Sequence, residues 1–285
     1  MLKEAYITKQ FYSEQPFPPG PYGLSMQISD SSLMYAISTS NFQNIVELVH
    51  VQFGNSATNS AQLKEQVVFL IQNYFLQRKK FEKVYIAFLN HDFTLVPEAF
   101  ATENNLRPLL NFSTGNTALR GPAAHFIKGI KFSHVIHPEL SDYIEKTFVN
   151  ASVRHTGAVN IGLLFSQHSL LESQVFMNIG DGCVELAIKN QADLQFYNVF
   201  NFQSNEDILY YLLFTMEQFG LNPLLVKLSL AGQVPVTDDL VKSLKKYIKH
   251  VLFCVHDPLL VFNGELRQLP QHYYFTLLNQ HTCGL

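Results

Sequence analysis

The sequence contains no tryptophan, only 3 cysteines among 285 residues, and a charged fraction of only 15%. Three widely separated cysteines, none in a Cys-x-x-Cys spacing, exclude a disulfide framework and a cysteine-rich zinc site. No apolar run approaches the roughly 20 residues that a spanning helix needs, so we expect no transmembrane segment. The 20 basic and 23 acidic residues also lack the basic excess typical of a broad nucleic-acid-binding surface.

Apolar residues are plentiful, at 47% of the chain, and aromatic residues make up 13%. A chain of this length can bury a substantial core, so the composition excludes a disordered or collagen-like protein. The first residues show no apolar signal-peptide core. We therefore expect a cytoplasmic protein with no membrane attachment and no nucleic-acid partner.

The first half of the chain predicts three short strands, then a helix, then another strand. Turn-forming residues separate the strands, and Asn59 or Ser60 is suited to cap the helix. The expected strands are Leu24–Ser29, Leu33–Thr39, Ile45–Phe53 and, after the helix, Lys83–Leu89.

The second half predicts the same order of elements. Ser204 and Asp207 form an approximate capping box at the start of its first helix. A second helix starts at Thr237 and is expected to turn Leu240, Leu244 and Tyr247 inward. The expected strands are Gln174–Ile179, Cys183–Lys189, Leu194–Phe200, Leu225–Leu230 and Val251–Val255.

Two segments show this repeat at the level of single residues. Residues 27–37 read QISDSSLMYAI and residues 178–188 read NIGDGCVELAI. Four aligned pairs are identical: Ile28 and Ile179, Asp30 and Asp181, Ala36 and Ala187, and Ile37 and Ile188. Hairpins use few residue types, so chance is an alternative, but the matching element order favours a duplication. We expect one half in residues 1–155, including an N-terminal arm, and the other in residues 156–285.

Each half predicts a mixed sheet flanked by helices, because a meander is followed by a helix and a crossover strand. Two such units in tandem are the plan of the ribonuclease-H-like, actin-like ATPase fold. The segment Phe93–Asn111, with its Thr-Leu-Val-Pro-Glu run, resembles a family of uncharacterised bacterial proteins, the domain-of-unknown-function family DUF3822. That family is assigned an actin-like ATPase fold. The second half, through NIGDGCVELAI and LVKLSLAGQVP, is similar to cell-division and pilus-assembly members of the actin-like superfamily.

The resemblance implies a nucleotide site built from one hairpin of each half. Such a site needs glycines where the backbone approaches phosphates, an Asp for hydrated Mg²⁺, and a glycine turn beside the adenosine. Gln27 and Asn178 stand where an Asp is expected, and Ser29 replaces a glycine. The candidate nucleotide-binding positions are Gln27, Ser29, Asp30, Asn178, Gly180, Asp181, Gly182 and Gly232. The other interpretation of the second hairpin is an ordinary tight turn, in which glycine supplies a positive φ.

Three other groups of residues are candidate sites. His134 and His137 have a spacing that metal ligands use, but no third ligand matches it, so we interpret them as structural or surface residues. The Asn90-His91-Asp92 run follows a strand, where functional groups or a simple polar loop can lie. The lysines at 242, 245, 246 and 249 share a helix face, which is either solvated or docks an acidic partner or RNA.

The altered residues at the nucleotide positions predict a protein that has kept the fold and lost the ATPase chemistry. We expect a protein–protein interaction scaffold with no catalytic residues, no metal and no cofactor. The protein partner stays unidentified and a homo-oligomer stays open. The alternative is an ATP-binding or weakly ATP-hydrolysing switch that uses ATP and Mg²⁺.

Overall fold

The computed structural model describes residues 6–14, 20–115, 123–166 and 172–283. Contacts divide the chain into two compact units. The first unit contains residues 1–159 together with two segments from the C-terminal part of the chain, 258–268 and 280–285. The second contains residues 160–257 and 269–279. The division into halves at residues 155 and 156 stays a prediction.

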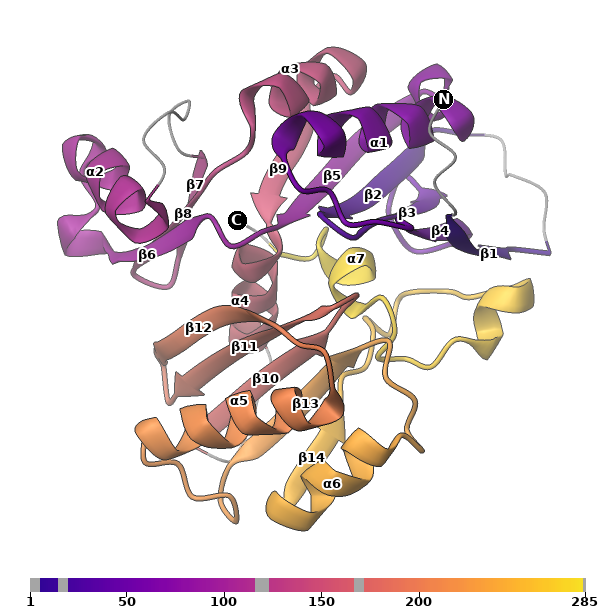
Figure 1. Ribbon diagram of the computed structural model, residues 1–285. Helices are drawn as coiled ribbons and strands as arrows, with labels where there is room; N and C mark the ends of the chain where they lie inside the picture. Colours follow the sequence, from indigo (N-terminus) through magenta and orange to yellow (C-terminus); the bar gives the residue numbers. More distant parts are fainter. Residues whose placement is uncertain (1–5, 15–19, 116–122, 167–171, 284–285) are drawn as a thin grey trace. The chain divides into compact units, whose positions relative to one another are not determined.

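The first unit is built on a six-stranded mixed sheet with two helices on one face (Figure 1). Side chains of both helices pack on this face of the sheet in one apolar core. In spatial order the strands are β1 (Ile7–Tyr12), β4 (Ile45–Gln52), β3 (Ser32–Thr39), β2 (Tyr22–Ser29), β5 (Phe81–Leu89) and β9 (Ala151–His155). The helices are α1 (Ser60–Asn73), which the one-turn helix η1 (Leu76–Arg78) follows, and α3 (Pro138–Thr147).

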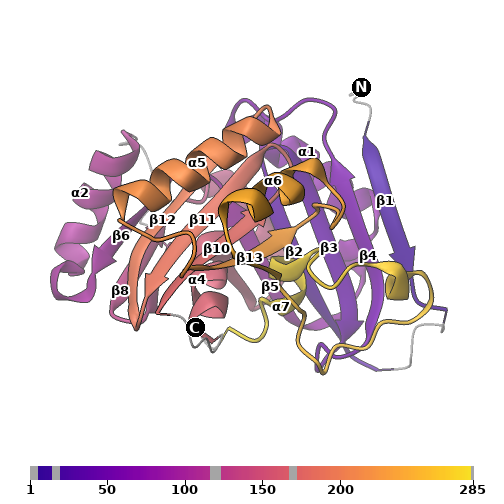
Figure 2. The same ribbon diagram turned by 90° about the horizontal axis from the view of Figure 1, so that it is seen from below.

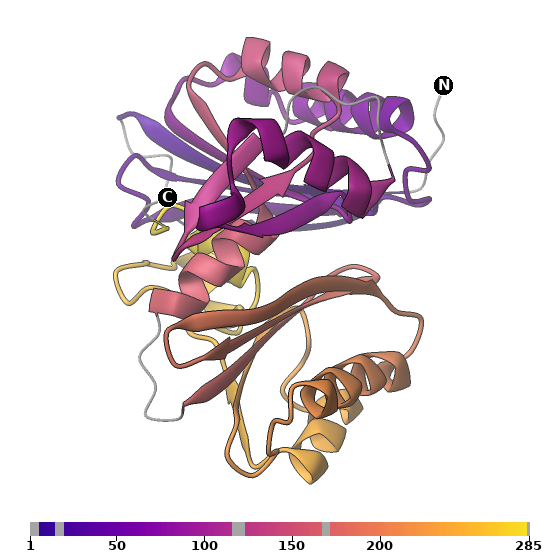
Figure 3. The ribbon, with the colours of Figure 1, turned by 90° about the vertical axis from the view of Figure 1, so that its left-hand side faces the viewer.

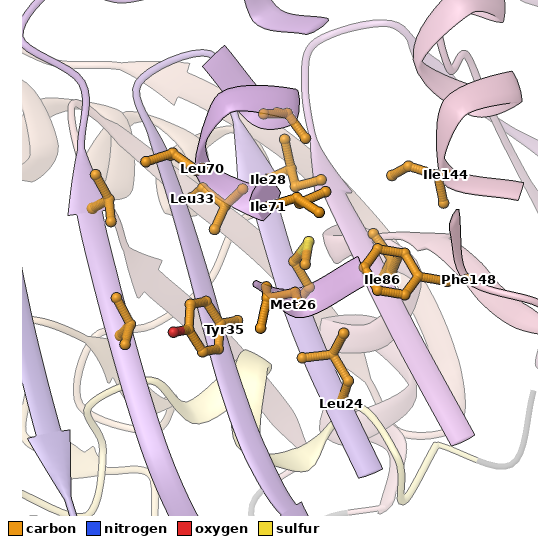
Figure 4. Packing of buried hydrophobic residues seen from close by; sticks show 14 of the residues in the cluster. Leu24, Met26, Ile28, Leu33, Tyr35, Leu70, Ile71, Ile86, Ile144 and Phe148 are labelled. Atoms are coloured by element: carbon orange, nitrogen blue, oxygen red, sulfur yellow. The ribbon is translucent and has the colours of Figure 1, made fainter. Parts of the chain in front are cut away.

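The core of this unit depends on the two-residue period of its strands. Met26 on β2 and Ile86 on β5 are register partners and are fully buried (Figure 4). Ile144 from α3 and Phe148 just after it cover the same face. The Asn59 side chain accepts a hydrogen bond of 3.0 Å from the Gln62 N–H, which confirms Asn59 as the cap of α1.

A small three-stranded antiparallel sheet with its own helix is inserted between β5 and α3 (Figure 3). Its strands, in spatial order, are β6 (Phe93–Pro97), β8 (Ile130–His134) and β7 (Ala123–Ile127), with η2 (Glu98–Phe100) and α2 (Glu103–Thr114) after β6. The sequence interpretation missed these strands and β9, because each has only five residues. The helix α2 buries little more than Leu106 and Leu110.

The second unit repeats the plan with five strands and two covering helices, α5 (Asn205–Gln218) and α6 (Asp239–Tyr247), on one face (Figure 2). In spatial order the strands are β12 (Asp193–Asn201), β11 (Cys183–Asn190), β10 (Ser173–Ile179), β13 (Lys227–Gly232) and β14 (His250–Phe253). Residues 160–166 of α4 (Thr156–Ser166) and the short α7 (Phe275–Asn279) also belong to this unit. The one-turn helix η3 (Gly264–Gln268) belongs to the first unit.

The two sheets have the same strand order once β1 is set aside. Register agrees too: Ile28 pairs with Leu33 in the first hairpin, and Ile179 pairs with Val184 in the second. β2 pairs in parallel with β5 as β10 does with β13. The duplicated architecture expected from the sequence is therefore present in the fold.

The capping box of α5 is also confirmed. The Ser204 hydroxyl accepts from the Asp207 N–H at 3.3 Å, and the Asp207 carboxylate accepts from the Ser204 N–H at 3.1 Å. The expected inward position of Tyr247 is wrong, since this residue is 53% exposed. The inward row continues from Leu244 to Ile248, four residues on, and leaves Tyr247 on the solvent side.

No helix among the residues that the structure describes is both long enough and apolar enough to cross a membrane.

Candidate functional site

The first hairpin, between β2 and β3, closes on the side chain of Ser29. The Ser29 hydroxyl oxygen accepts from the backbone N–H of Ser32 at 3.0 Å and of Ser31 at 3.3 Å. It also lies 3.1 Å from the Ser32 hydroxyl. The resemblance expects such turn N–H groups to face a phosphate, but here a serine oxygen already occupies them.

The loop before α1 holds the same turn from outside. The Ser31 carbonyl accepts from the Phe53 N–H at 2.8 Å, and the Asp30 carbonyl accepts from the Ala57 N–H at 2.7 Å. Two donors of the turn backbone, the Ser31 and Ser32 N–H groups, and two acceptors, the Asp30 and Ser31 carbonyls, are thus used within the first unit. Gln27 is buried in β2 and paired with Met34 and Ala87 in register.

Asp30 stands exposed at the tip of this hairpin. Surrounding protein atoms withdraw its carboxyl from water, which raises the pKa of Asp30. The imidazoles of His137 and His91 lower that pKa, while the Asp92 carboxylate raises it. Asp30, the Asn90-His91-Asp92 loop and His137 therefore share one electrostatic neighbourhood, which their separation in sequence did not indicate.

The second hairpin, between β10 and β11, closes through a backbone hydrogen bond. The Gly180 N–H donates to the Cys183 carbonyl at 2.9 Å, and Gly182 has a φ of +78°. Asp181 lies at the tip and is half-buried. Burial raises the pKa of Tyr274, and the Asp181 carboxylate raises it further, so the two side chains lie close in the second unit.

Asn178, which stands where a magnesium-binding Asp is expected, is bonded to a buried glutamate. Its side-chain amide donates to the Glu185 carboxylate at 2.8 Å. Asn160 donates to the same oxygen at 2.9 Å, and the Tyr197 hydroxyl donates to the other oxygen at 2.7 Å. Thr276 donates in turn to Asn160 at 2.6 Å. Glu185 is only 1% exposed, so these donors replace the water that its charge has lost.

The three candidate glycines of the second unit differ in what requires them. Gly232 has a φ of +95°, and a Cβ there would lie 2.0 Å from the Ile179 carbonyl oxygen. The positive φ of Gly182 alone favours glycine, because a Cβ there meets no atom within 4 Å. Gly180 has an ordinary φ, and the nearest atom to an added Cβ would be the Cys183 carbonyl oxygen at 3.6 Å. Backbone conformation and packing therefore explain Gly182 and Gly232 but not Gly180.

Three histidines that are distant in sequence gather in the first unit: His125 on β7, His134 on β8 and His155 on β9. The His134 ring centroid lies 5.7 Å from that of His125 and 5.6 Å from that of His155. Neither ring nitrogen of His134 has a hydrogen-bond partner among the described residues. Sequence spacing paired His134 with His137 instead, because nothing local shows that β7, β8 and β9 meet.

His155 must be neutral to make its two hydrogen bonds. Its Nδ1 accepts from the Gly157 N–H at 2.9 Å, so its Nε2 carries the proton and donates to the Asn90 carbonyl at 3.0 Å. Burial lowers the pKa of His155 to about 3 and brings the pKa of His134 well below its ordinary value. Both nitrogens of His155 are occupied, and no group of three or more His, Cys, Asp or Glu in the described ranges is arranged to hold a metal ion.

The two units together define an actin-like ATPase fold. A crystal structure of a protein with this fold and unknown function from Bacteroides thetaiotaomicron VPI-5482 matches at a TM-score of 0.71 and 17% identity. The match covers 82% of this chain and 90% of that chain. A chain of the PilM–PilN type IV pilus biogenesis complex matches at a TM-score of 0.59 and 11% identity, covering 93% of this chain and 98% of that chain. At such identities the likeness shows the fold alone.

The chain belongs to the family described as protein of unknown function (DUF3822), whose model matches residues 17–251. No curated protein sequence matches the chain at a significant level. The family and the fold expected from the sequence are both confirmed.

The glycine geometry predicts opposite outcomes for two alanine variants. Gly232→Ala should lower the free energy of unfolding by more than about 2 kcal/mol, because its Cβ collides with backbone at a positive φ. Gly180→Ala should change it by less than about 1 kcal/mol. Urea unfolding followed by circular dichroism measures both, and equal losses would contradict this account of the two positions.

The buried carboxylate predicts the order of two substitutions at residue 178. Asn178→Ala removes one donor of Glu185 and should cost about 1–3 kcal/mol. Asn178→Asp places a second buried carboxyl beside Glu185 and should cost more at pH 7. That excess should shrink as the pH falls, because the new carboxyl has a raised pKa and becomes neutral. Urea titrations at pH 7 and pH 5 give the order, and an Asp variant as stable as the parent protein would contradict it.

The histidine cluster predicts acid sensitivity. The folded state keeps His134 and His155 neutral, whereas the unfolded chain protonates them below about pH 6.5. Stability is therefore fully present above that pH, and each histidine should remove about 1 kcal/mol between pH 7 and pH 5.5. His134→Phe should flatten this dependence in urea titrations across the same range. An identical slope in the variant would show that His134 titrates equally in both states.

Proposed function

We propose that this protein is a non-catalytic member of the actin-like fold that acts as a protein–protein interaction scaffold. The observation that carries the proposal is the hydrogen bonding of Ser29 and Asn178. Both stand where the resemblance implies nucleotide contacts, and both are uncharged. The Ser29 hydroxyl and the Asn178 amide N–H are bonded to partners within their own unit.

The chemistry of Mg²⁺ supports the loss of ATPase activity. This ion binds through carboxylate and phosphate oxygens, and a neutral amide supplies no compensating charge. Gln27 and Asn178 carry amides at both expected Asp positions. Glu185, the carboxylate nearest to Asn178 in register, is surrounded by three donors and buried. A hydrated ion could reach the Glu185 carboxylate only by displacing those donors.

The comparisons add an example of a protein of this fold found in a complex. The PilM–PilN structure is a complex of a type IV pilus system. The Bacteroides protein shares the fold and has no known function. A scaffold role for this chain is therefore compatible with the behaviour of its fold, and a homo-oligomer stays part of the proposal.

The proposal places the protein in the cytoplasm. Its three cysteines, Cys183, Cys254 and Cys283, are free and buried in the structure. Free thiols suit a reducing compartment.

One observation favours a second function, an ATP-binding switch. Gly180 is a glycine that neither its φ nor its packing requires. A backbone that must approach a ligand closely is a further reason for glycine at such a turn. Under this alternative the second hairpin alone keeps its phosphate contact.

Calorimetric titration of the full chain with ATP, with and without Mg²⁺, separates the two functions. The scaffold proposal predicts no binding heat up to millimolar ATP and no rise in melting temperature. Gly180→Ala is the matched variant, because it adds one methyl group without strain at the turn. Micromolar binding that is weakened at least tenfold in Gly180→Ala would contradict the proposal and establish the switch.

A further inference from the structure

A surface of the second unit, at the C-terminal end of α6, combines lysines with exposed apolar side chains. Residues 240–256 contain four lysines and no Asp or Glu, and residues 219–230 contain one lysine and no Asp or Glu. The chain as a whole has a net charge of −3, so this concentration of one sign is local. We name it the α6 surface, and it consists of Leu225, Lys245, Lys246, Tyr247, Lys249 and Leu252.

The backbone brings these segments together. The Lys249 N–H donates to the Pro223 carbonyl at 3.1 Å, which holds the loop after α5 against the residues that follow α6. Tyr247 is the last residue of α6, and β14 begins at His250 directly after it. β14 lies at the edge of the sheet and, among the described strands, pairs only with β13.

The side chains of the α6 surface face solvent. Leu225 is 63% exposed, and Leu252 is 52% exposed. Lys242, earlier on the helix, forms an ion pair of 2.7 Å with Asp239. No described carboxylate forms an ion pair with the three lysines of the α6 surface. Leu252 lies on the face of the sheet away from α6, because its neighbours Val251 and Phe253 pack into the core beneath that helix. The lysines at the end of α6 and Leu252 therefore belong to opposite faces of the sheet, with the edge strand β14 between them.

We propose that the α6 surface docks an extended acidic segment of a partner protein, in which carboxylates alternate with apolar side chains. This inference rests on the proposed scaffold function and gives its partner a chemistry. A strand added at the edge of β14 points alternate side chains to the two faces of the sheet, so its carboxylates would pair with the lysines on the α6 side and its apolar side chains would cover Leu252 on the other side. The open edge of β14 favours a polypeptide over a lipid surface or RNA, because only a polypeptide offers backbone groups in strand spacing.

The first experiment measures fluorescence anisotropy of a labelled ten-residue peptide of alternating Glu and Val with the full-length protein. Its partner probe is the same peptide with Lys in place of Glu. The Glu peptide should bind, the Lys peptide should bind at least tenfold more weakly, and added salt should weaken binding without abolishing it. No binding of the Glu peptide at millimolar protein, or equal binding of both peptides, would overturn the proposal.

Matched variants assign the binding to the α6 surface. The triple variant Lys245→Glu, Lys246→Glu and Lys249→Glu should weaken peptide binding at least tenfold. The control triple Lys80→Glu, Lys83→Glu and Lys128→Glu makes the same change in net charge at exposed positions of the first unit. Leu252→Ser should weaken binding several-fold even at high salt, because it removes the exposed apolar side chain of β14. Equal losses in the two lysine triples would overturn the assignment.

Three further probes test whether another kind of ligand binds the α6 surface instead. Vesicles containing phosphatidylserine, a single-stranded poly-uridine RNA, and the protein itself in a concentration series on a sizing column are tested with the same variants. Tighter binding of vesicles or RNA, or self-association lost in the Lys245–Lys249 triple variant, would overturn the acidic segment in favour of that occupant. ATP binding would overturn the scaffold function independently, whereas peptide failure without ATP binding overturns only this surface.

Discussion

The hydrogen bond between Asn178 and Glu185 is the constraint on which the chemistry of the second unit depends. Glu185 is a carboxylate in the interior of a sheet, and such a group is tolerated only when donors replace its hydration. Asn178, Asn160 and Tyr197 provide those donors from β10, α4 and β12. An Asp at residue 178 would turn a donor into a second buried acid. The residue suited to magnesium is thus incompatible with the network that now occupies the position.

The first unit reaches a comparable outcome by other means. Its hairpin has the same register as the second, but Met34 stands at the position equivalent to Glu185, so Gln27 has no carboxylate opposite it. Here the small side chain of Ser29 takes up the turn N–H groups, and the loop at residues 53–57 takes up the turn carbonyls. Each copy of the fold therefore engages polar groups at its candidate positions from within its own unit: the N–H groups of Ser31 and Ser32 in the first, and the Asn178 amide in the second. An account based on structural reuse of the actin-like fold explains both, whereas a conserved phosphate site would leave backbone donors available.

Much of the fold follows from short-range sequence signals. Strand alternation, the Asn59 cap and the Ser204–Asp207 box are local, and each predicted its element. The strands at residues 93–97, 123–127 and 130–134 were beyond such signals, because five-residue strands carry little periodicity. The sequence predicted the positions of the candidate site residues but not their hydrogen-bond partners. That Ser29 closes its own turn, that Asn178 bonds Glu185, and that His125, His134 and His155 meet all depend on pairings between segments that the sequence does not display.

The central claim is that the protein's own side chains already accept the N–H groups of the first hairpin turn. Its most direct test is to follow the amide NMR signals of Ser31 and Ser32 while ATP and Mg²⁺ are added. The account predicts that the Ser31 and Ser32 signals keep their chemical shifts up to millimolar nucleotide, because the Ser29 oxygen already accepts both N–H groups. Saturable shifts of these two amides would contradict it, since they would mean that a phosphate replaces the serine oxygen.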